Sequence, residues 1–127
     1  MKRAYLLMLL LACLSCKKSA DTPTPTDPIV AAPTMNIKFN SDRQATYYIT
    51  EADPQTNEFT TKEGDDVTSL DYTFTPQVGH KVIIEIVAPV NANLTASASY
   101  NSKPIGPLVA VKDANYTTIN YTYVVSK

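Results

Sequence analysis

The chain has 127 residues, of which 44% are hydrophobic and 18% are charged, and its formal net charge at pH 7 is -1. This length leaves room for one small domain once a leader is removed. The nearly balanced charge lacks the basic footprint on which nucleic-acid binding depends, so we expect no nucleic-acid partner.

The N-terminal segment has the order of a secretory signal. Lys2 and Arg3 precede an unbroken apolar run at residues 4–12, and small residues follow. A basic head, a short apolar middle and a small residue before the cleavage point are typical of export signals. A membrane-spanning helix needs about 20 apolar residues, whereas Lys17 and Lys18 interrupt this segment earlier. We therefore expect a cleaved signal peptide at residues 1–15.

A cysteine follows the small residue at the end of this segment, in the order Ser15-Cys16. The junction resembles the lipobox of bacterial lipoproteins, in particular those of the Bacteroidota, in which cleavage exposes a cysteine that carries acyl chains such as palmitate. The resemblance implies lipidation of Cys16, and cleavage after Ala12 with Cys13 as the modified residue is the alternative. Stable anchoring takes more than one acyl chain. The resemblance therefore implies a protein lipid-anchored in the cell envelope, at the outer membrane, with the periplasmic or surface face left open.

A Pro/Thr-rich linker follows the modified cysteine, so that residues 16–34 form an anchor and stalk. Prolines recur at positions 23, 25, 28 and 33. Proline fixes φ and removes a hydrogen-bond donor, which favours extended polyproline II structure. At 3.1 Å per residue such a segment reaches at most about 55 Å. The folded domain is then expected at residues 35–127, without a cysteine and hence without a disulfide.

The domain has the pattern of β-structure. β-branched residues and tyrosines are abundant, and no long run has the 3.6-residue period of a helix. We expect strands at residues 35–40, 45–50, 59–62, 69–75, 81–88, 94–100, 105–112 and 116–125. Gly106 and Pro107 make 105–112 an irregular edge or a bulge, and 81–88 is central because both its faces are mostly apolar. Seven to eight short strands with frequent turns predict an all-β, antiparallel, immunoglobulin-like β-sandwich.

The order of segments in the domain is similar to that of another family. A tyrosine-rich strand at 45–50 precedes Phe74-Thr-Pro-Gln-Val-Gly79 and the apolar strand 81–88, and a strand at 94–100 ends in a polar turn. This order resembles the small accessory membrane proteins of mycobacterial lipid transporters and related β-sandwich lipoproteins, over most of residues 35–111. The chain lacks the tryptophan and paired cysteines of that family, so the resemblance implies architecture and no functional residue.

Catalytic and metal-binding signals are weak. His80 is the only histidine, and a histidine base needs a nucleophile and an orienting group that nothing in the sequence marks. We expect His80 to be an exposed turn residue, and we expect no catalytic residue, no metal site and no cofactor. Zinc in particular needs more nitrogen and sulfur ligands than one histidine provides.

Acidic residues cluster in two expected loops. The first holds Glu51, Asp53 and Glu58, and the second holds residues 63, 65, 66 and 71. Calcium takes six to eight oxygen ligands, so two acidic loops suggest a calcium site. The spacing lacks the Asp-x-Asp-x-Asp-Gly pattern of a strong calcium loop, and we therefore expect solvated loop charges.

Seven tyrosines fall in the expected domain, and most share the parity of buried neighbours. Such tyrosines pack a core with the hydroxyl at its rim. Tyr48 and Tyr116 have the opposite parity, which makes them the candidate ligand contacts.

These features together predict a lipid-anchored, non-enzymatic cell-envelope protein. It would reach the membrane through its acyl chains and act as a binding or accessory module for an envelope protein or a glycan. The alternatives are a calcium-dependent adhesion-type module and a hydrolase acting on envelope polymers.

Overall fold

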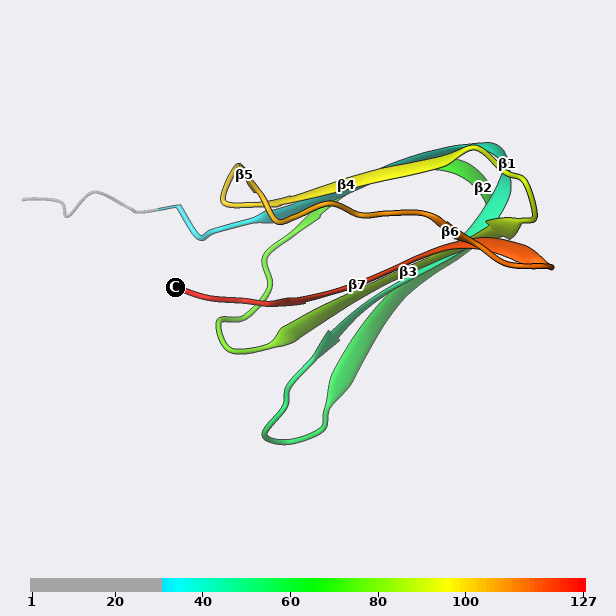
Figure 1. The fold of residues 1–127 in the computed structure, drawn as a ribbon. Helices are drawn as coiled ribbons and strands as arrows, with labels where there is room; N and C mark the ends of the chain where they lie inside the picture. Colours follow the sequence, from blue (N-terminus) through cyan, green and yellow to red (C-terminus); the bar gives the residue numbers. More distant parts are fainter. Residues whose placement is uncertain (1–30) are drawn as a thin grey trace, which may run out of the picture. The chain divides into compact units, whose positions relative to one another are not determined.

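The computed structural model describes residues 31–127, and within this range every regular element is a β-strand. The strands are β1 (Met35–Ala52), β2 (Phe59–Phe74), β3 (Lys81–Pro89), β4 (Leu94–Tyr100), β5 (Lys103–Pro104), β6 (Val111–Lys112) and β7 (Tyr116–Val124) (Figure 1). All ladders between them are antiparallel, which confirms the all-β, antiparallel prediction. The expected signal peptide, Cys13, Cys16 and residues 17–30 of the linker lie outside the described residues.

Two long strands replace four expected short ones. The predicted breaks within residues 35–50 and within 59–75 were wrong, because β1 and β2 each run through. The β1–β2 ladder contains register shifts between Asn40 and Ala45 and between Ala45 and Tyr47. Such irregularities bend a strand without ending its pairing. The polar residues at the bend therefore interrupt the apolar alternation but not the strand.

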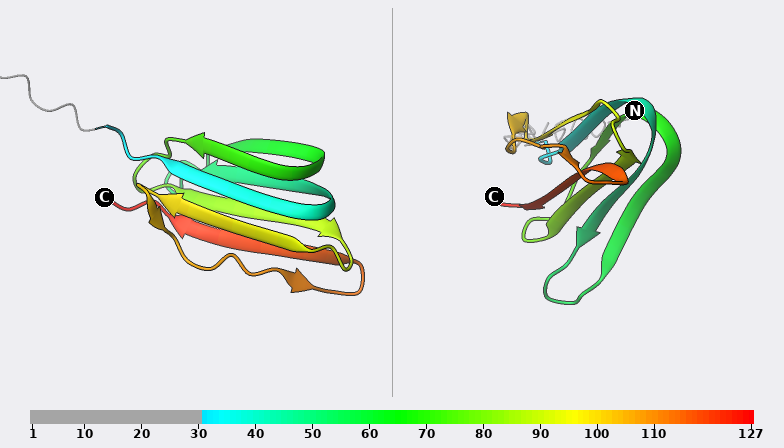
Figure 2. Two further views of the ribbon diagram at one scale, coloured as in Figure 1. Left: turned by 90° about the horizontal axis from the view of Figure 1, so that it is seen from above. Right: turned by 45° about the vertical axis from the view of Figure 1, so that its right-hand side comes forward.

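The bend divides the β1–β2 hairpin between two layers of one curled sheet. The first half of β1 pairs with β4, and its second half pairs with β3. The strand order is β5-β4-β1-β3-β7-β6, with β2 paired to β1 along both halves. Figure 2 shows how the hairpin curves round from one layer to the other.

The core lies between the two layers. Alternate residues of β1 point inward, as do those of β3, because side chains on a strand alternate between its faces. The largest fully buried side chains are Phe39, Met35, Ile37, Ile84, Ile86, Ile119, Val82, Val125 and Thr117. These residues come from β1, β3 and β7 and their ends, so the hydrophobic effect stabilises the contact between the layers.

Strand β3 is central, as predicted, because it lies between β1 and β7. Only one of its apolar faces is buried. Ile83 is 39% exposed and Glu85 is exposed, whereas Ile84 and Ile86 are fully buried. An apolar second face therefore does not mean that a third layer covers it. Glu85 faces outward from this strand.

A strap of irregular chain, residues 103–112, crosses from β4 to β7 along one side of the layers (Figure 1). It is the expected irregular edge, and only β5 and β6 are regular within it. Ile105 and Leu108 of the strap are buried, and Leu108 forms an isolated bridge with Ala96 of β4. The Tyr121 hydroxyl of β7 donates a hydrogen bond to the Ile105 carbonyl. The strap thereby closes this side of the domain.

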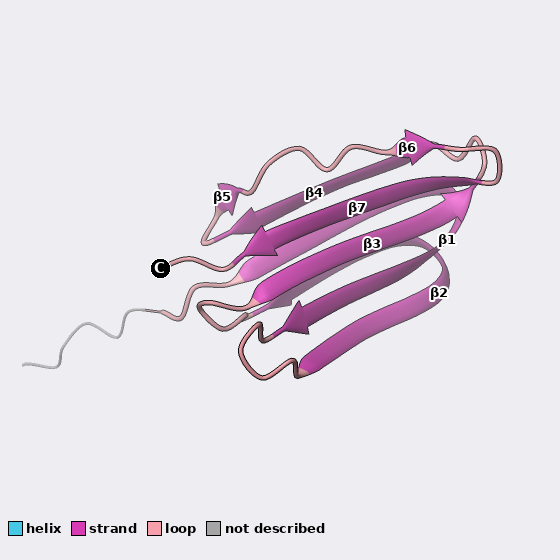
Figure 3. Cartoon of the chain, turned by 60° about the horizontal axis from the view of Figure 1, so that its bottom comes forward, coloured by secondary structure: helices cyan, strands magenta, loops and turns pink. Residues whose placement is uncertain are grey.

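Both ends of β1 lie at the same end of the domain. Phe74 pairs with Met35 and Lys81 pairs with Ala52, and only residues 75–80 connect these two partners. Figure 3 shows the start of β1, the tip of the β1–β2 hairpin and the C-terminus gathered at this end. Residue 34 is fixed there by a hydrogen bond of 2.8 Å from the Asn101 amide. Within residues 31–127, no helix is long and apolar enough to span a bilayer.

Candidate functional site

Two adjoining hollows lie on the side of the domain opposite the strap, along β2. The larger has a volume of about 570 Å³ and is lined by Glu51, Asp53, Asn57, Glu58, Phe59, Thr60, Gln77 and His80. The smaller has a volume of about 210 Å³ and is lined by Ile49, Glu51, Thr60, Thr61, Lys62, Tyr72 and Phe74. They share Glu51 and Thr60, and we call them together the β2 groove.

The bend in β2 builds the two walls of this groove. Thr60 and Lys62, from the first half of β2, pair with inward positions of β1 in one layer. Tyr72 and Phe74, from the second half, pair with the buried Ile37 and Met35 in the other layer. One strand therefore supplies a polar wall and an aromatic wall that face the same space.

The aromatic wall is a stacked pair. The ring centroids of Tyr72 and Phe74 lie 5.1 Å apart with an interplanar angle of 14°. Both rings are half-buried and pack against the core. Phe59 lines the larger hollow, where its side chain is 72% exposed. The aromatic pair therefore provides the half-buried ring surface of the groove, in its smaller part.

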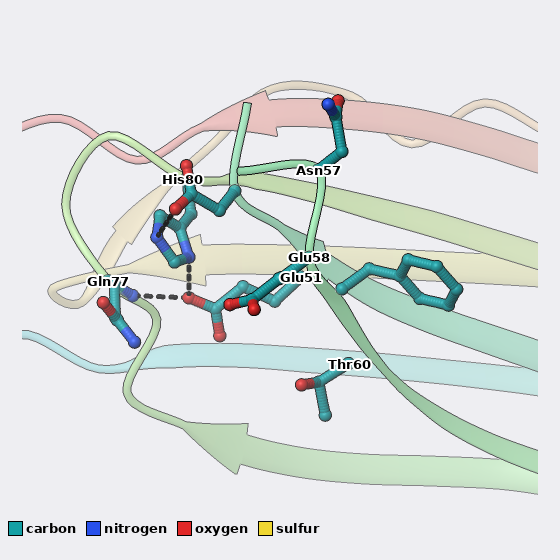
Figure 4. A pocket seen from close by; sticks show the side chains of 8 residues that line it. Glu51, Asn57, Glu58, Thr60, Gln77 and His80 are labelled. Carbon is teal, nitrogen blue, oxygen red and sulfur yellow. Dashed lines mark hydrogen bonds and ion pairs between the residues drawn. The ribbon is translucent and has the colours of Figure 1, made fainter. Parts of the chain in front are cut away.

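His80 joins the hairpin tip to the chain before β3, and its side chain is only 18% exposed. Its Nδ1 lies 2.9 Å from Glu51 Oε1, and its Nε2 lies 3.8 Å from Asp53 Oδ2. The Gln77 backbone N–H donates a hydrogen bond of 2.7 Å to the same Glu51 oxygen (Figure 4). The expectation of an exposed turn histidine was therefore wrong.

The backbone around His80 explains its inward position. Gly79 has a φ of +92°, in the left-handed region that glycine adopts readily. The Gly79 amide donates to the Val125 carbonyl at 2.8 Å, and the Val125 amide donates to the His80 carbonyl at 2.9 Å. These two bonds hold the loop against the C-terminal residues and turn the imidazole toward the hairpin tip.

Asp53 organises the tip of the β1–β2 hairpin. The Gln55 backbone N–H and the Thr56 hydroxyl donate hydrogen bonds to its carboxylate at 2.8 and 3.0 Å. These hydrogen bonds, the Gln55 bond foremost, and the nearby His80 hold the pKa of the Asp53 carboxyl below its ordinary value. Asn57 adopts a φ of +61°, which asparagine tolerates better than most residues, and completes the turn.

The groove combines hydrogen-bond acceptors with aromatic surface. Glu51, Asp53 and Glu58 are three carboxylates along its larger part, whereas Lys62 is the lysine of its smaller part. Ionised carboxylates only accept hydrogen bonds, so they bind ligands that carry hydroxyl or ammonium donors. The groove is therefore suited to a polyhydroxylated or amine-bearing ligand with apolar faces.

The acidic residues of the second expected loop lie in β2 and do not converge with the first set. Asp71 pairs with Lys38 at 2.9 Å and accepts a hydrogen bond of 2.7 Å from Asn36. The Asn36 bond, and then Lys38, lower the pKa of the Asp71 carboxyl. Among residues 31–127, no group of three or more potential ligand side chains is arranged to hold a metal ion.

Tyr48 and Tyr116 both lie on the outer face of the β1–β3–β7 layer and are 37% and 52% exposed. Tyr48 is in register with Glu85 and, through it, with Asn120, four residues along β7 from Tyr116. Strand spacings place the two tyrosines about 16 Å apart. Neither lines the β2 groove. Their role as ligand contacts stays a prediction.

The sequence reasoning missed Phe59, Tyr72, Phe74 and Gln77 as groove residues. Tyr72 and Phe74 alternate with the apolar Leu70, so their parity predicts core positions, and they do face inward. They line a groove because the bend in β2 separates the two halves of the strand. The one available signal was the turn-forming segment around Pro76 and Gly79, which predicts a turn before His80 but not the direction of its imidazole.

Comparison with known proteins found no matching family model, no matching curated protein and no matching solved structure. The resemblances to bacterial lipoproteins and to the accessory proteins of mycobacterial lipid transporters therefore stay predictions.

Proposed function

We propose that this protein is a lipid-anchored, non-enzymatic binding module of the cell envelope, acylated on Cys16 and held at the outer membrane. The lipobox-like segment and the Pro/Thr-rich linker support the anchor. In this proposal the domain is an immunoglobulin-like sandwich, and its two facing layers support that proposal. It binds an envelope protein or a glycan at the end of its stalk.

The observation that carries a binding rather than a catalytic function is the position of the His80 imidazole between two carboxylates of the β2 groove. Nucleophilic catalysis needs one imidazole nitrogen within reach of the nucleophile while the other is held by an orienting group. In this domain, Nδ1 contacts Glu51 and Nε2 faces Asp53. Both nitrogens are directed at carboxylates, which favours a histidine that joins the hairpin tip to the loop before β3 over one that activates a hydroxyl.

The anchor is tested by mass spectrometry of the mature protein and by detergent-phase partitioning. We expect an acylated N-terminal cysteine at position 16 and recovery in the detergent phase. Cys16→Ser should move the protein to the aqueous phase, whereas the control Cys13→Ser should leave it acylated. An unmodified Cys16, or a leader still attached, would contradict the anchor.

The binding function is tested by cosedimentation of the acylated protein, in detergent, with insoluble envelope fractions. We expect retention without release of reducing ends or peptides from those fractions. His80→Ala provides the control for catalysis. Release of fragments by the wild type that His80→Ala abolishes would show a hydrolase and overturn the non-enzymatic proposal.

A further inference from the structure

We infer that the β2 groove binds a saccharide chain that is neutral or amine-bearing, and that it rejects polyanionic saccharides. The inference rests on the proposed function, that the protein is a binding module, and adds the ligand class and the residues that recognise it.

The dimensions of the groove suit a chain of several sugar rings. Ligand-binding clefts typically have volumes of about 300–1,000 Å³, and the two hollows have about 570 and 210 Å³. Because they share Glu51 and Thr60, the two hollows adjoin along β2, and a linear ligand can contact both. A linear ligand is therefore favoured over a compact one.

Aromatic residues line both hollows, and the Tyr72–Phe74 pair provides a stacking surface. The face of an aromatic ring carries negative charge, which attracts the C–H groups on the apolar face of a pyranose. Phe59 lies 72% exposed at the larger hollow, and Tyr72 and Phe74 form a stacked pair in the smaller.

The polar residues of the larger hollow match the hydroxyl groups of a sugar. Glu51, Asp53 and Glu58 accept hydrogen bonds, while Asn57 and Gln77 carry amides that both donate and accept. Glu51 is fixed in place by its bonds from the Gln77 backbone N–H and from His80. Prepositioned acceptors reduce the entropy that a ligand loses on binding.

The charge of the groove decides between classes of saccharide. Three carboxylates line the larger hollow, and His80 is the one basic side chain there. Lys62 adds a positive charge only in the smaller hollow. Like charges repel more strongly away from bulk water, so a uronic acid or sulfated chain is disfavoured. An ammonium group of an amino sugar would be attracted to Glu58 and its neighbours.

Binding of an extended peptide along the free edge of β2 is less favoured by the structure. Charged residues occupy that edge at Lys62, Glu63, Asp65 and Asp66, and Asp66 has a φ of +56°. Charges and irregular backbone on an edge strand oppose pairing with another strand. The groove between the layers is therefore the better binding surface.

The test measures binding of three probes to the full-length mature acylated protein in detergent micelles by isothermal titration calorimetry. The probes are a glucosamine hexamer, cellohexaose and a galacturonate hexamer. We expect the glucosamine hexamer and cellohexaose to bind and the galacturonate hexamer to bind at least tenfold more weakly, as roughly expected from one unfavourable charge contact.

Two variants locate the binding site. Phe59→Ala should weaken both binding probes by roughly tenfold, while the matched control Val111→Ala, an exposed apolar residue of β6, should leave them unchanged. Glu58→Gln should weaken the glucosamine hexamer more than cellohexaose, while Glu85→Gln on the outer face should weaken neither. Phe59 and Glu58 are exposed, so both variants should fold, which thermal melting verifies.

Each outcome bears on one of the two proposals. Retention on envelope fractions without binding of any hexamer would overturn the saccharide inference and leave the binding function intact. Equal binding of the galacturonate hexamer, or loss of binding in Tyr48→Ala or Tyr116→Ala but not in Phe59→Ala, would also overturn it. If the acylated wild-type protein does not cosediment with envelope fractions, the proposed function itself is overturned.

Discussion

The two sides of the domain differ in how completely they cover the space between the layers. On one side the strap crosses from β4 to β7 and buries Ile105 and Leu108. On the other side β2 bends from layer to layer, and Tyr72 and Phe74 stay half-buried beside a groove. The strap side contributes burial to stability, whereas the β2 side leaves surface available for a ligand. The same curled sheet thus separates a stabilising side from a binding side.

The largest effect is expected from removing β7, on which the strap side depends. A chain ending before Tyr116 loses the β3–β7 ladder, the buried Ile119 and the tyrosine that bonds the strap. These losses exceed the stability of a typical small domain. We expect no cooperative thermal transition by circular dichroism, while a control lacking only residues 126–127 melts like the wild type. A truncated chain that still melts cooperatively would show that the domain folds without β7.

A pair of glycine substitutions compares the two sides directly. Gly106 in the strap has a φ of +105°, and an added Cβ would lie 2.7 Å from the Tyr121 hydroxyl oxygen. Gly79, beside the groove, has a φ of +92° with no atom within 4 Å of such a Cβ. Gly79→Ala carries only backbone strain of about 1–2 kcal/mol, whereas Gly106→Ala adds a steric clash of about 1 kcal/mol or more.

Denaturant unfolding measures both variants, and the free energy of unfolding should fall further for Gly106→Ala. Equal losses would show that Tyr121 moves aside freely and that its bond to the strap contributes little.

Thr117 offers a smaller change of opposite sign next to the strap. Its side chain is fully buried, and its hydroxyl has no hydrogen-bond partner among the described residues. A buried polar group without a partner costs about 1–3 kcal/mol. Thr117→Val keeps the shape and removes the hydroxyl, so we expect the free energy of unfolding to rise by roughly 1 kcal/mol. Thr118→Val, at the half-buried neighbouring position, is the control, and a decrease for Thr117→Val would contradict the prediction.

The smallest effect is a pH dependence that both sides share. Hydrogen bonds from the Tyr116 and Asn115 amides lower the pKa of the Asp113 carboxyl below 3.8, and the Gln55 amide does so foremost for Asp53. A carboxyl with a lower pKa in the folded state stabilises fully at pH values above 3.8. This contribution is lost as the pH falls through the lowered value.

Asp113→Asn and Asp53→Asn should therefore lower the melting temperature at pH 6 and differ less from the wild type near pH 3. A difference that grew on acidification would contradict the sign.

Local patterns in the sequence predicted that the domain consists of β-strands and where several of them lie. Strands were predicted at residues 94–100 and 116–125 and are found there as β4 and β7, with Leu94, Ala98 and Ile119 at alternate positions in the core. Predictions failed where distant residues decide the outcome. Neither the continuity of β1 through its bend nor the inward position of His80 could be read from neighbours in sequence.

The sequence by itself therefore determined that the described domain is β-structure and which side chains face inward, because both follow from a period of two along each strand. Only the tertiary structure decided where the sheet curls, and hence that Tyr72, Phe74, Glu51 and His80 line one groove. The physical reason is that a bulge needs only a small local change in pairing, while its effect on the direction of a long strand brings together residues far apart in the chain.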